Sequence, residues 1–334
     1  MTSATAPSPS ARLELADPPR RKPKVGFGDL VALTMRQHRL ALGCTVLLYV
    51  LFGLLIQLTQ GEASIGYWRF DPKDYAAALA GVIAMFWGAP LLATEYEQRT
   101  TVLVWSQDVS PVRWLLAKLT LLSGAVVVLS SLMALLVRSQ AAEEYSRSPS
   151  PYSPLGVFGS VGYEAWLPLS LAYAVFGFLF GVAVGALFRR TVTAIGVTLV
   201  GFGAIRFLVA YVLRPWLVNN LITPVRQTWS MSTWITPDPH AATGAGPRDF
   251  LVNSQIWLDH TGKVVYIPDA CYSVTGIKPF GNCMMANGVA ATGEDYQPFS
   301  RLVIFQSVEL AVYVVLIVVC LGVALWSVRR KASI

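Results

Sequence analysis

The chain has 334 residues, of which 54% are hydrophobic and only 13% are charged. This balance excludes an ordinary soluble domain and indicates a protein that crosses a membrane several times. The formal net charge of +7 also suits nucleic-acid binding, but we expect no nucleic-acid partner, because in a membrane protein the positions of Lys and Arg matter more than their sum.

The first part of the chain is polar. Residues 1–26 are rich in Ser, Pro and Arg, which predicts a disordered cytoplasmic tail without a signal peptide, whose basic residues suit contact with anionic lipid heads. Residues 27–39 place apolar side chains broadly on one side of a helix that ends in basic residues. We expect this helix to lie along the inner membrane surface. The alternative is a plain cytoplasmic extension of the first membrane span.

Six apolar runs follow, each long enough to cross a bilayer, because about 20 helical residues span about 30 Å of hydrocarbon. The runs cover residues 40–58, 76–94, 119–137, 166–188, 192–213 and 302–328. The fold class expected is therefore an all-α polytopic membrane protein with six transmembrane helices. The first five of these helices lie within residues 40–213.

The orientation follows from Lys and Arg, which gather in the short segments between alternate runs. Short basic segments stay in the cytoplasm. This predicts a multi-pass protein of the plasma membrane with both termini inside, including the basic tail 329–334, and with the connection 95–118 inside as well. Residues 59–75, 138–165 and 214–301 are then outside the cell.

The connection 95–118 holds more apolar residues than a connector needs. Ser110-Pro111 interrupts it and predicts a kink between two short helices. We interpret Trp105 as a contact for a partner protein, whereas Trp114 suits the lipid headgroups. The alternative is a loop whose tryptophans both anchor at the membrane surface. The residues predicted to dock the partner are Glu95, Glu97, Arg99, Thr100, Trp105, Asp108, Pro111 and Arg113.

The fourth apolar run contains Gly177, Gly181 and Gly185, which recur every four residues. Glycines at this spacing line one face of a helix and let another helix approach closely. The series predicts tight helix packing but does not identify the neighbouring helix.

Two charges, Arg206 and Glu309, lie well inside apolar runs. Each is about seven residues from the outer end of its run, or roughly 10 Å deep at about 1.5 Å per residue. An isolated charge there costs about 3 kcal/mol or more, so we expect the two to pair with each other or to face a wet cavity. Gln306, one turn before Glu309, extends this polar patch. A structural ion pair and a gate or substrate contact both stay open.

Residues 214–301 are too many for a connector and predict a small extracellular insertion, α/β or irregular, between the fifth and sixth helices. Loosely alternating residues on either side of residues 259–262 predict a β-hairpin. In an oxidising compartment, Cys271 and Cys283 favour a disulfide over two free thiols.

Motifs for nucleotides and metals are absent from the sequence. It has no Gly-x4-Gly-Lys-Ser/Thr phosphate loop and no His-Glu-x-x-His or Cys-x-x-Cys pattern. If nucleotide energy is used, a partner must bind the nucleotide. We therefore assign no cofactor, metal or catalytic residue to this chain.

The order of these features resembles the permease subunits of type-2 ATP-binding-cassette exporters, and among them actinobacterial members. The likeness is carried by residues 91–100 (LLATEYEQRT) and 111–118 (PVRWLLAK), and by the short segments 35–39, 186–191 and 296–301. Arg99 departs from the pattern, because such loops usually have Gly there.

The resemblance implies two permease copies, identical or related, and two separate ATPase subunits that carry ATP and Mg and dock within about residues 100–111. It also implies outward movement of an amphipathic drug, antibiotic, peptide or lipid by a chain that is not itself an enzyme. The alternatives are a membrane sensor or immunity component with the permease fold, or a membrane-bound enzyme.

Overall fold

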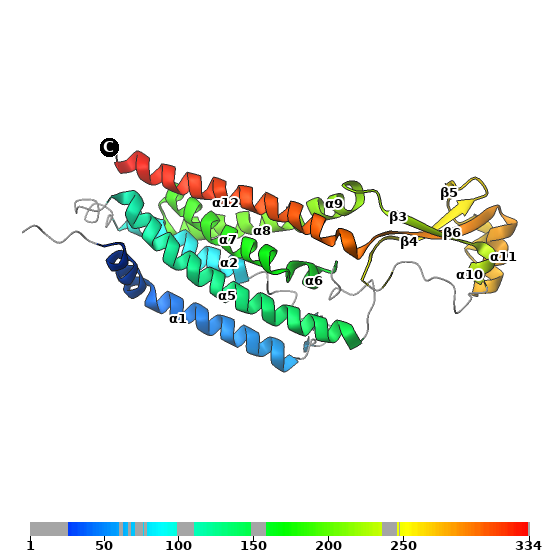
Figure 1. Ribbon diagram of the computed structural model, residues 1–334, viewed down its shortest axis with the longest axis horizontal. Helices are drawn as coiled ribbons and strands as arrows, with labels where there is room; N and C mark the ends of the chain where they lie inside the picture. Colours follow the sequence, from blue (N-terminus) through cyan, green and yellow to red (C-terminus); the bar gives the residue numbers. More distant parts are fainter. Residues whose placement is uncertain are drawn as a thin grey trace, which may run out of the picture.

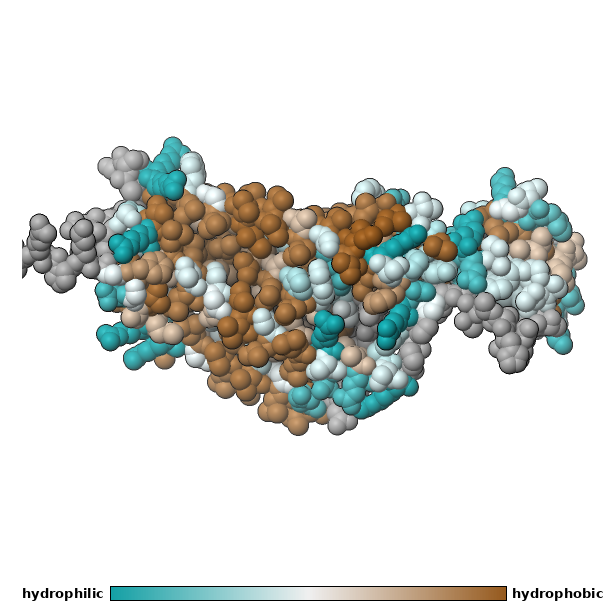
Figure 2. Space-filling view, in the orientation of Figure 1, coloured by the Kyte–Doolittle hydropathy of each residue, from teal (hydrophilic) through white to brown (hydrophobic). Residues whose placement is uncertain are grey.

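The computed structural model describes residues 26–59, 63–65, 68–70, 76, 79–98, 110–147, 158–235, 246 and 248–332. Within them, 6 stretches of helix are long and apolar enough to cross a membrane. The prediction of a mostly helical polytopic protein is thus confirmed. Figure 2 shows the physical basis on one face of the molecule, a broad apolar band across the helices with polar residues at both ends.

The spans are longer than the apolar runs that predict them. In chain order they are α1 (Phe27–Thr59), then α2 (Leu79–Ile83) with η2 (Ala84–Gly88) and α3 (Ala89–Glu97), α5 (Pro111–Arg147), α7 (Leu167–Phe188), α8 (Thr191–Leu208) with η3 (Val209–Leu213) and α9 (Arg214–Asn220), and α12 (Leu302–Ala332). A short helix, α6 (Ser160–Glu164), precedes α7. The predicted surface helix 27–39 is part of α1 rather than a separate element.

Two of the spans contain a wide π-helical turn, and each turn ends just before a proline. η2 precedes Pro90, and η3 precedes Pro215. Proline has no N–H to donate, and its ring clashes with the carbonyl one turn earlier. A π-turn at this position widens the backbone and relieves that clash while the helix continues.

The glycine series on α7 packs against the second span. A Cβ atom added at Gly181 would lie 2.3 Å from the Ala84 carbonyl oxygen, and one at Gly185 would lie 2.3 Å from the Ala89 carbonyl oxygen. Such distances leave no room for any side chain. The neighbour that the sequence left unidentified is therefore η2 and α3, and α7 is the most enclosed of the spans.

The segment between the fifth and sixth spans contains a four-stranded antiparallel sheet in the order β3-β6-β4-β5. Its strands are β3 (Val225–Ser230), β4 (Phe250–Asp259), β5 (Val264–Val265) and β6 (Val289–Gln297). The predicted hairpin is the β4–β5 pair, in which Leu258 lies opposite Val264. Figure 1 shows this sheet projecting beyond the helices at the end opposite the C-terminus. Near the first span, β1 (Ala63–Ile65) and β2 (Trp68–Phe70) form a short second hairpin.

Two short helices, α10 (Met231–Ile235) and α11 (Ile277–Ala286), cover the far end of the sheet. A disulfide joins Cys271 to Cys283 there. Beside it, the rings of Trp234, Trp257 and Phe280 meet edge to face. The small aromatic core and the disulfide together hold the tip of the projection.

Removing the disulfide should loosen this tip locally. The double variant Cys271→Ser with Cys283→Ser is expected to lose about 3 kcal/mol of local stability, because the bond closes a short loop in the unfolded chain. Chymotrypsin cleavage after Phe280, which packs in the aromatic core inside the disulfide-closed loop, measures this opening and should accelerate on the order of 100-fold. Cys44→Ser, at the exposed free thiol of α1, is the control. Equal cleavage rates in both variants would contradict the prediction.

Candidate functional site

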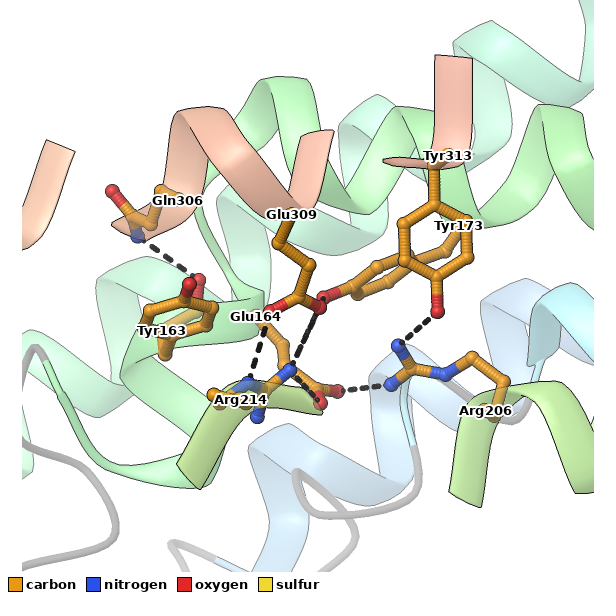
Figure 3. Close-up of polar contacts among 8 residues, drawn as sticks. All are labelled: Tyr163, Glu164, Tyr173, Arg206, Arg214, Gln306, Glu309 and Tyr313. Carbon is orange, nitrogen blue, oxygen red and sulfur yellow. Dashed lines mark hydrogen bonds and ion pairs between the residues drawn. The ribbon is translucent and has the colours of Figure 1, made fainter. Parts of the chain in front are cut away.

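Four charged side chains meet inside the bundle, near the end that carries the sheet (Figure 3). Glu164 ends α6, Arg206 lies on α8, Arg214 begins α9, and Glu309 lies in the first turns of α12. The Glu164 carboxylate pairs with both guanidinium groups, at 2.8 Å from Arg206 and 2.9 Å from Arg214. Arg214 also pairs with Glu309 at 3.1 Å. Two positive and two negative charges balance, so the cluster joins α6, the fifth span (α8 to α9) and α12 without a net charge.

Tyrosine side chains complete the charge cluster. The Tyr173 hydroxyl donates a hydrogen bond to Glu309 over 2.6 Å, and Arg206 donates one to the Tyr313 hydroxyl over 3.2 Å. The Arg206 guanidinium lies 3.9 Å from the centre of the Tyr173 ring. These contacts matter because Glu309 is 0% exposed, and a buried charge is tolerated only where ion pairs and hydrogen bonds replace its water.

Glu164 is held in its charged form. Burial by itself raises the pKa of its carboxyl group, but the positive charges of Arg206 and Arg214 and the hydrogen bonds that they donate outweigh burial. The pKa of Glu164 therefore lies below its ordinary value. We conclude that Glu164 is ionised at neutral pH and links the two guanidinium groups.

The predicted intramembrane pair, Arg206 and Glu309, lies within this cluster, but each residue forms its ion pair with another residue. Arg206 pairs with Glu164, and Glu309 pairs with Arg214. Gln306, expected to extend the patch, donates instead to the Tyr163 carbonyl oxygen over 3.2 Å.

Sequence reasoning missed Glu164 and Arg214 because they lie just outside apolar runs, Glu164 before the fourth and Arg214 after the fifth, and were assigned to segments outside the membrane. The fifth span continues past its run to Asn220, and α6 places Glu164 beside it. The sequence did contain a usable signal. Glu164 and Arg214 carry opposite charges and lie near the same end of neighbouring spans as Arg206 and Glu309, which predicts that they meet.

A cavity of about 950 Å³ lies beside the charge cluster, among α2, η2, α5, α7 and α8. Glu164, Arg206 and Arg214 stand on its wall, whereas most of the remaining lining is apolar. The cavity therefore has a charged end and an apolar body.

At the opposite end of the bundle, two predicted docking residues sit in contacts between spans. Glu95, near the end of α3, forms an ion pair with Lys118 of α5, whose side chain is 2% exposed. Glu97, the last residue of α3, accepts hydrogen bonds from the backbone N–H and hydroxyl of Thr191, at 3.0 and 2.7 Å. These contacts tie α3 to the first turns of both α5 and α8.

The other docking residues divide into two groups. Pro111 begins α5, and the Ser110 hydroxyl before it accepts a hydrogen bond from the backbone N–H of Arg113 over 3.3 Å, which caps the helix. The Arg113 side chain is exposed. The remaining four, Arg99, Thr100, Trp105 and Asp108, lie outside the described residues.

The interpretation of Trp114 as a residue at the lipid headgroups is wrong. Its side chain is 4% exposed, and the Lys118 ammonium lies 4.3 Å from its ring centre. The ring covers the buried Lys118 and thereby shields the ion pair with Glu95.

Comparison with known proteins finds a family to which the chain is similar. A family model described as "ABC-2 membrane transporter related" matches residues 72–214. This range holds the second to fourth spans and most of the fifth, the contacts of Glu95 and Glu97, and three of the four charges in the cluster. The match confirms the resemblance seen in the sequence, although the likeness to actinobacterial members stays a prediction. No curated protein and no solved structure matches the chain.

Proposed function

We propose that this relative of the ABC-2 membrane transporters is the permease subunit of an exporter, driven by separate ATPase subunits that dock on residues 95–118. That the chain is a multi-pass component of a membrane transporter follows from its family match and from the 6 membrane-length helices among the described residues. The observation that carries the finer proposal is the buried ion pair between Glu95 and Lys118. It joins α3 and α5 at the two ends of the predicted docking segment.

A push on the docking segment would reach the charge cluster through packed contacts. The pair of Glu95 and Lys118 makes α3 and α5 respond together. The backbone of α3 lies so close to Gly185 of α7 that no side chain fits between them. α7 in turn carries Tyr173, which donates to Glu309 of α12. Because close-packed helices move as rigid bodies, movement at one end of this path displaces the other.

The proposed orientation places the docking segment and both termini in the cytoplasm. The end of the bundle that holds them carries exposed arginines on several spans, and basic segments stay inside. These arginines are Arg36, Arg39, Arg113, Arg189, Arg190, Arg329 and Arg330. The sheet then faces the cell exterior, an oxidising environment that suits the disulfide.

In the proposed assembly, two ATPase subunits bind ATP and Mg²⁺ and carry out hydrolysis, and a second permease copy completes the path. This chain itself binds no nucleotide and catalyses no reaction. The cargo is amphipathic and moves outward.

The test is loss of the ATPase through a change at its docking surface. Trp105→Ala with Arg113→Glu should reduce the amount of ATPase subunit that copurifies with the chain at least tenfold, because it removes an aromatic contact and reverses an exposed charge. Lys278→Glu, an exposed charge on α11, is the matched control and should leave copurification unchanged. ATP-driven uptake of a lipophilic dye by inside-out vesicles should fall with the docking variant alone. Absence of an ATPase from the wild-type preparation, or wild-type vesicles without uptake, would contradict the proposal.

A further inference from the structure

The cavity beside the charge cluster has the size and shape of a ligand site. Its volume of about 950 Å³ is at the upper end of the range for sites that enclose drug-sized molecules. Gly81 of α2, Met133 and Ala134 of α5 and Gly203 of α8 belong to its apolar wall. Because these side chains are small or flexible, the apolar part of the cavity has room for a hydrocarbon chain or an aromatic group.

The cavity also opens sideways through the membrane-facing surface. Leu199, Phe207 and Tyr211 line it from α8 and η3. The same side chains are 53%, 59% and 71% exposed. Side chains that line the cavity and are this exposed leave it open at the apolar surface of the fifth span, so we expect its occupant to partition into a bilayer.

The charged end of the cavity offers hydrogen-bond donors and little accepting capacity. Each oxygen of Glu164 is already paired with one of the two guanidinium groups. Among the residues that the structure describes, the Nε of Arg206 and the Nη1 of Arg214 have no hydrogen-bond partner. In Figure 3 this Arg214 nitrogen is turned away from Glu309.

The balance of charge at this wall is positive. Two guanidinium groups and one carboxylate line the cavity, whereas Glu309, the fourth member of the cluster, does not. Guanidinium groups bind carboxylate and phosphate oxygens through planar, charge-assisted hydrogen bonds. The wall therefore complements an anion and not a cation.

We propose that the cavity binds an amphipathic molecule with an anionic, oxygen-rich head, either a carboxylate or a phosphate ester. The head contacts Arg206 and Arg214, and the apolar body extends along α5 and α8. A membrane phospholipid and a free amphiphilic acid share this chemistry. Binding needs neither an ATPase subunit nor a second copy of the chain, so this site stands even if the proposed transport function fails.

The head-group requirement is testable with the full chain in an uncharged maltoside detergent. The probe is 11-(dansylamino)undecanoic acid, whose fluorescence rises in an apolar site, and competitors displace it. Oleate should displace the probe at a concentration at least tenfold lower than oleyl alcohol or oleylamine, which have the same chain without the negative charge. If dioleoylphosphatidylglycerol displaces the probe at the same concentration as oleate, the site binds a phospholipid head. If the phospholipid does not displace the probe, the site binds a free acid. Equal displacement by the alcohol or the amine would overturn the proposal.

The location is testable with two glycines of α8. An added Cβ has nothing within 4 Å at either Gly196 or Gly203, but only Gly203 lines the cavity. Gly203→Phe should raise the Kd of the probe at least tenfold by filling the cavity, and Gly196→Phe should change it less than twofold. Ala210→Leu, on the same wall, is a second filling variant should Gly203→Phe fail to elute as a single species. Wild-type affinity in a folded filling variant would overturn the proposal.

Discussion

Glu309→Ala is expected to destabilise the protein by about 3–5 kcal/mol, because it leaves the Arg214 guanidinium without one of its two carboxylate partners inside the bundle. The same change removes the acceptor of the Tyr173 hydroxyl. The midpoint of thermal unfolding in detergent, followed by a thiol-reactive fluorophore at Cys320 in a Cys44→Ser background that removes the exposed free thiol, measures the loss. Cys320 is buried in α12, so its labelling reports the opening of the helix that carries Glu309.

The control for this prediction is an ion pair of the same kind at the surface. Glu143 and Arg147 pair on α5 at 2.7 Å with side chains 60% and 64% exposed. Glu143→Ala should cost less than about 0.5 kcal/mol, because water and salt already screen an exposed pair. Equal losses from Glu143→Ala and Glu309→Ala would show that the buried cluster contributes nothing beyond a surface contact.

A double variant separates an uncompensated charge from lost packing. Glu309→Met combined with Arg214→Met removes both charges, and it should recover part of the stability lost by Glu309→Ala, because apolar side chains often replace a buried pair at little cost. Charge reversal of Arg206 and Glu309 together should give no rescue, since each residue pairs with a different partner. If that reversal did rescue stability, it would indicate that Arg206 and Glu309 pair directly, as their equal depth in the sequence predicts.

The features that sequence predicts well here are those in which the local pattern is itself the cause. An apolar run forms a membrane-length helix because its backbone must satisfy its own hydrogen bonds in lipid. Ser110-Pro111 begins α5 because serine caps a helix and proline fits its first turn. The hairpin at residues 259–262 follows from turn residues, with Gly262 at a φ of +80°.

The features that sequence predicts poorly depend on contacts between distant segments. Arg206 and Glu309 lie at similar depth, but the partner of each is set by how α6 and α9 pack, and no local pattern records that packing. Trp114 has the composition and position of an interfacial residue, yet it is buried over Lys118. In each case the nearest charged side chain in space, rather than the depth in the bilayer, decides the contact.

The same reasoning explains why the glycine series identified tight packing but not the packed helix. Spacing along α7 places Gly177, Gly181 and Gly185 on one face, which is a local property. The opposing surface is the backbone of η2 and α3, and its fit depends on the π-turn before Pro90. That turn carries the carbonyl group of Ala84, and the first residue of α3 carries that of Ala89; both lie against α7.

Gly181→Ala is therefore expected to cost more than about 3 kcal/mol, at or above the upper end for overpacked sites. The added methyl group would meet the Ala84 carbonyl oxygen at 2.3 Å, the Ala89 nitrogen at 2.8 Å and the Gly88 carbonyl carbon at 3.0 Å. All three are backbone atoms, so no side chain can rotate to make room and the two spans must separate. Gly124→Ala on α5, where an added Cβ meets nothing within 4 Å, should instead stabilise its helix by up to about 1 kcal/mol. The thermal midpoint in detergent should move in opposite directions in the two variants, and equal midpoints would show that the spans are less tightly packed than these distances require.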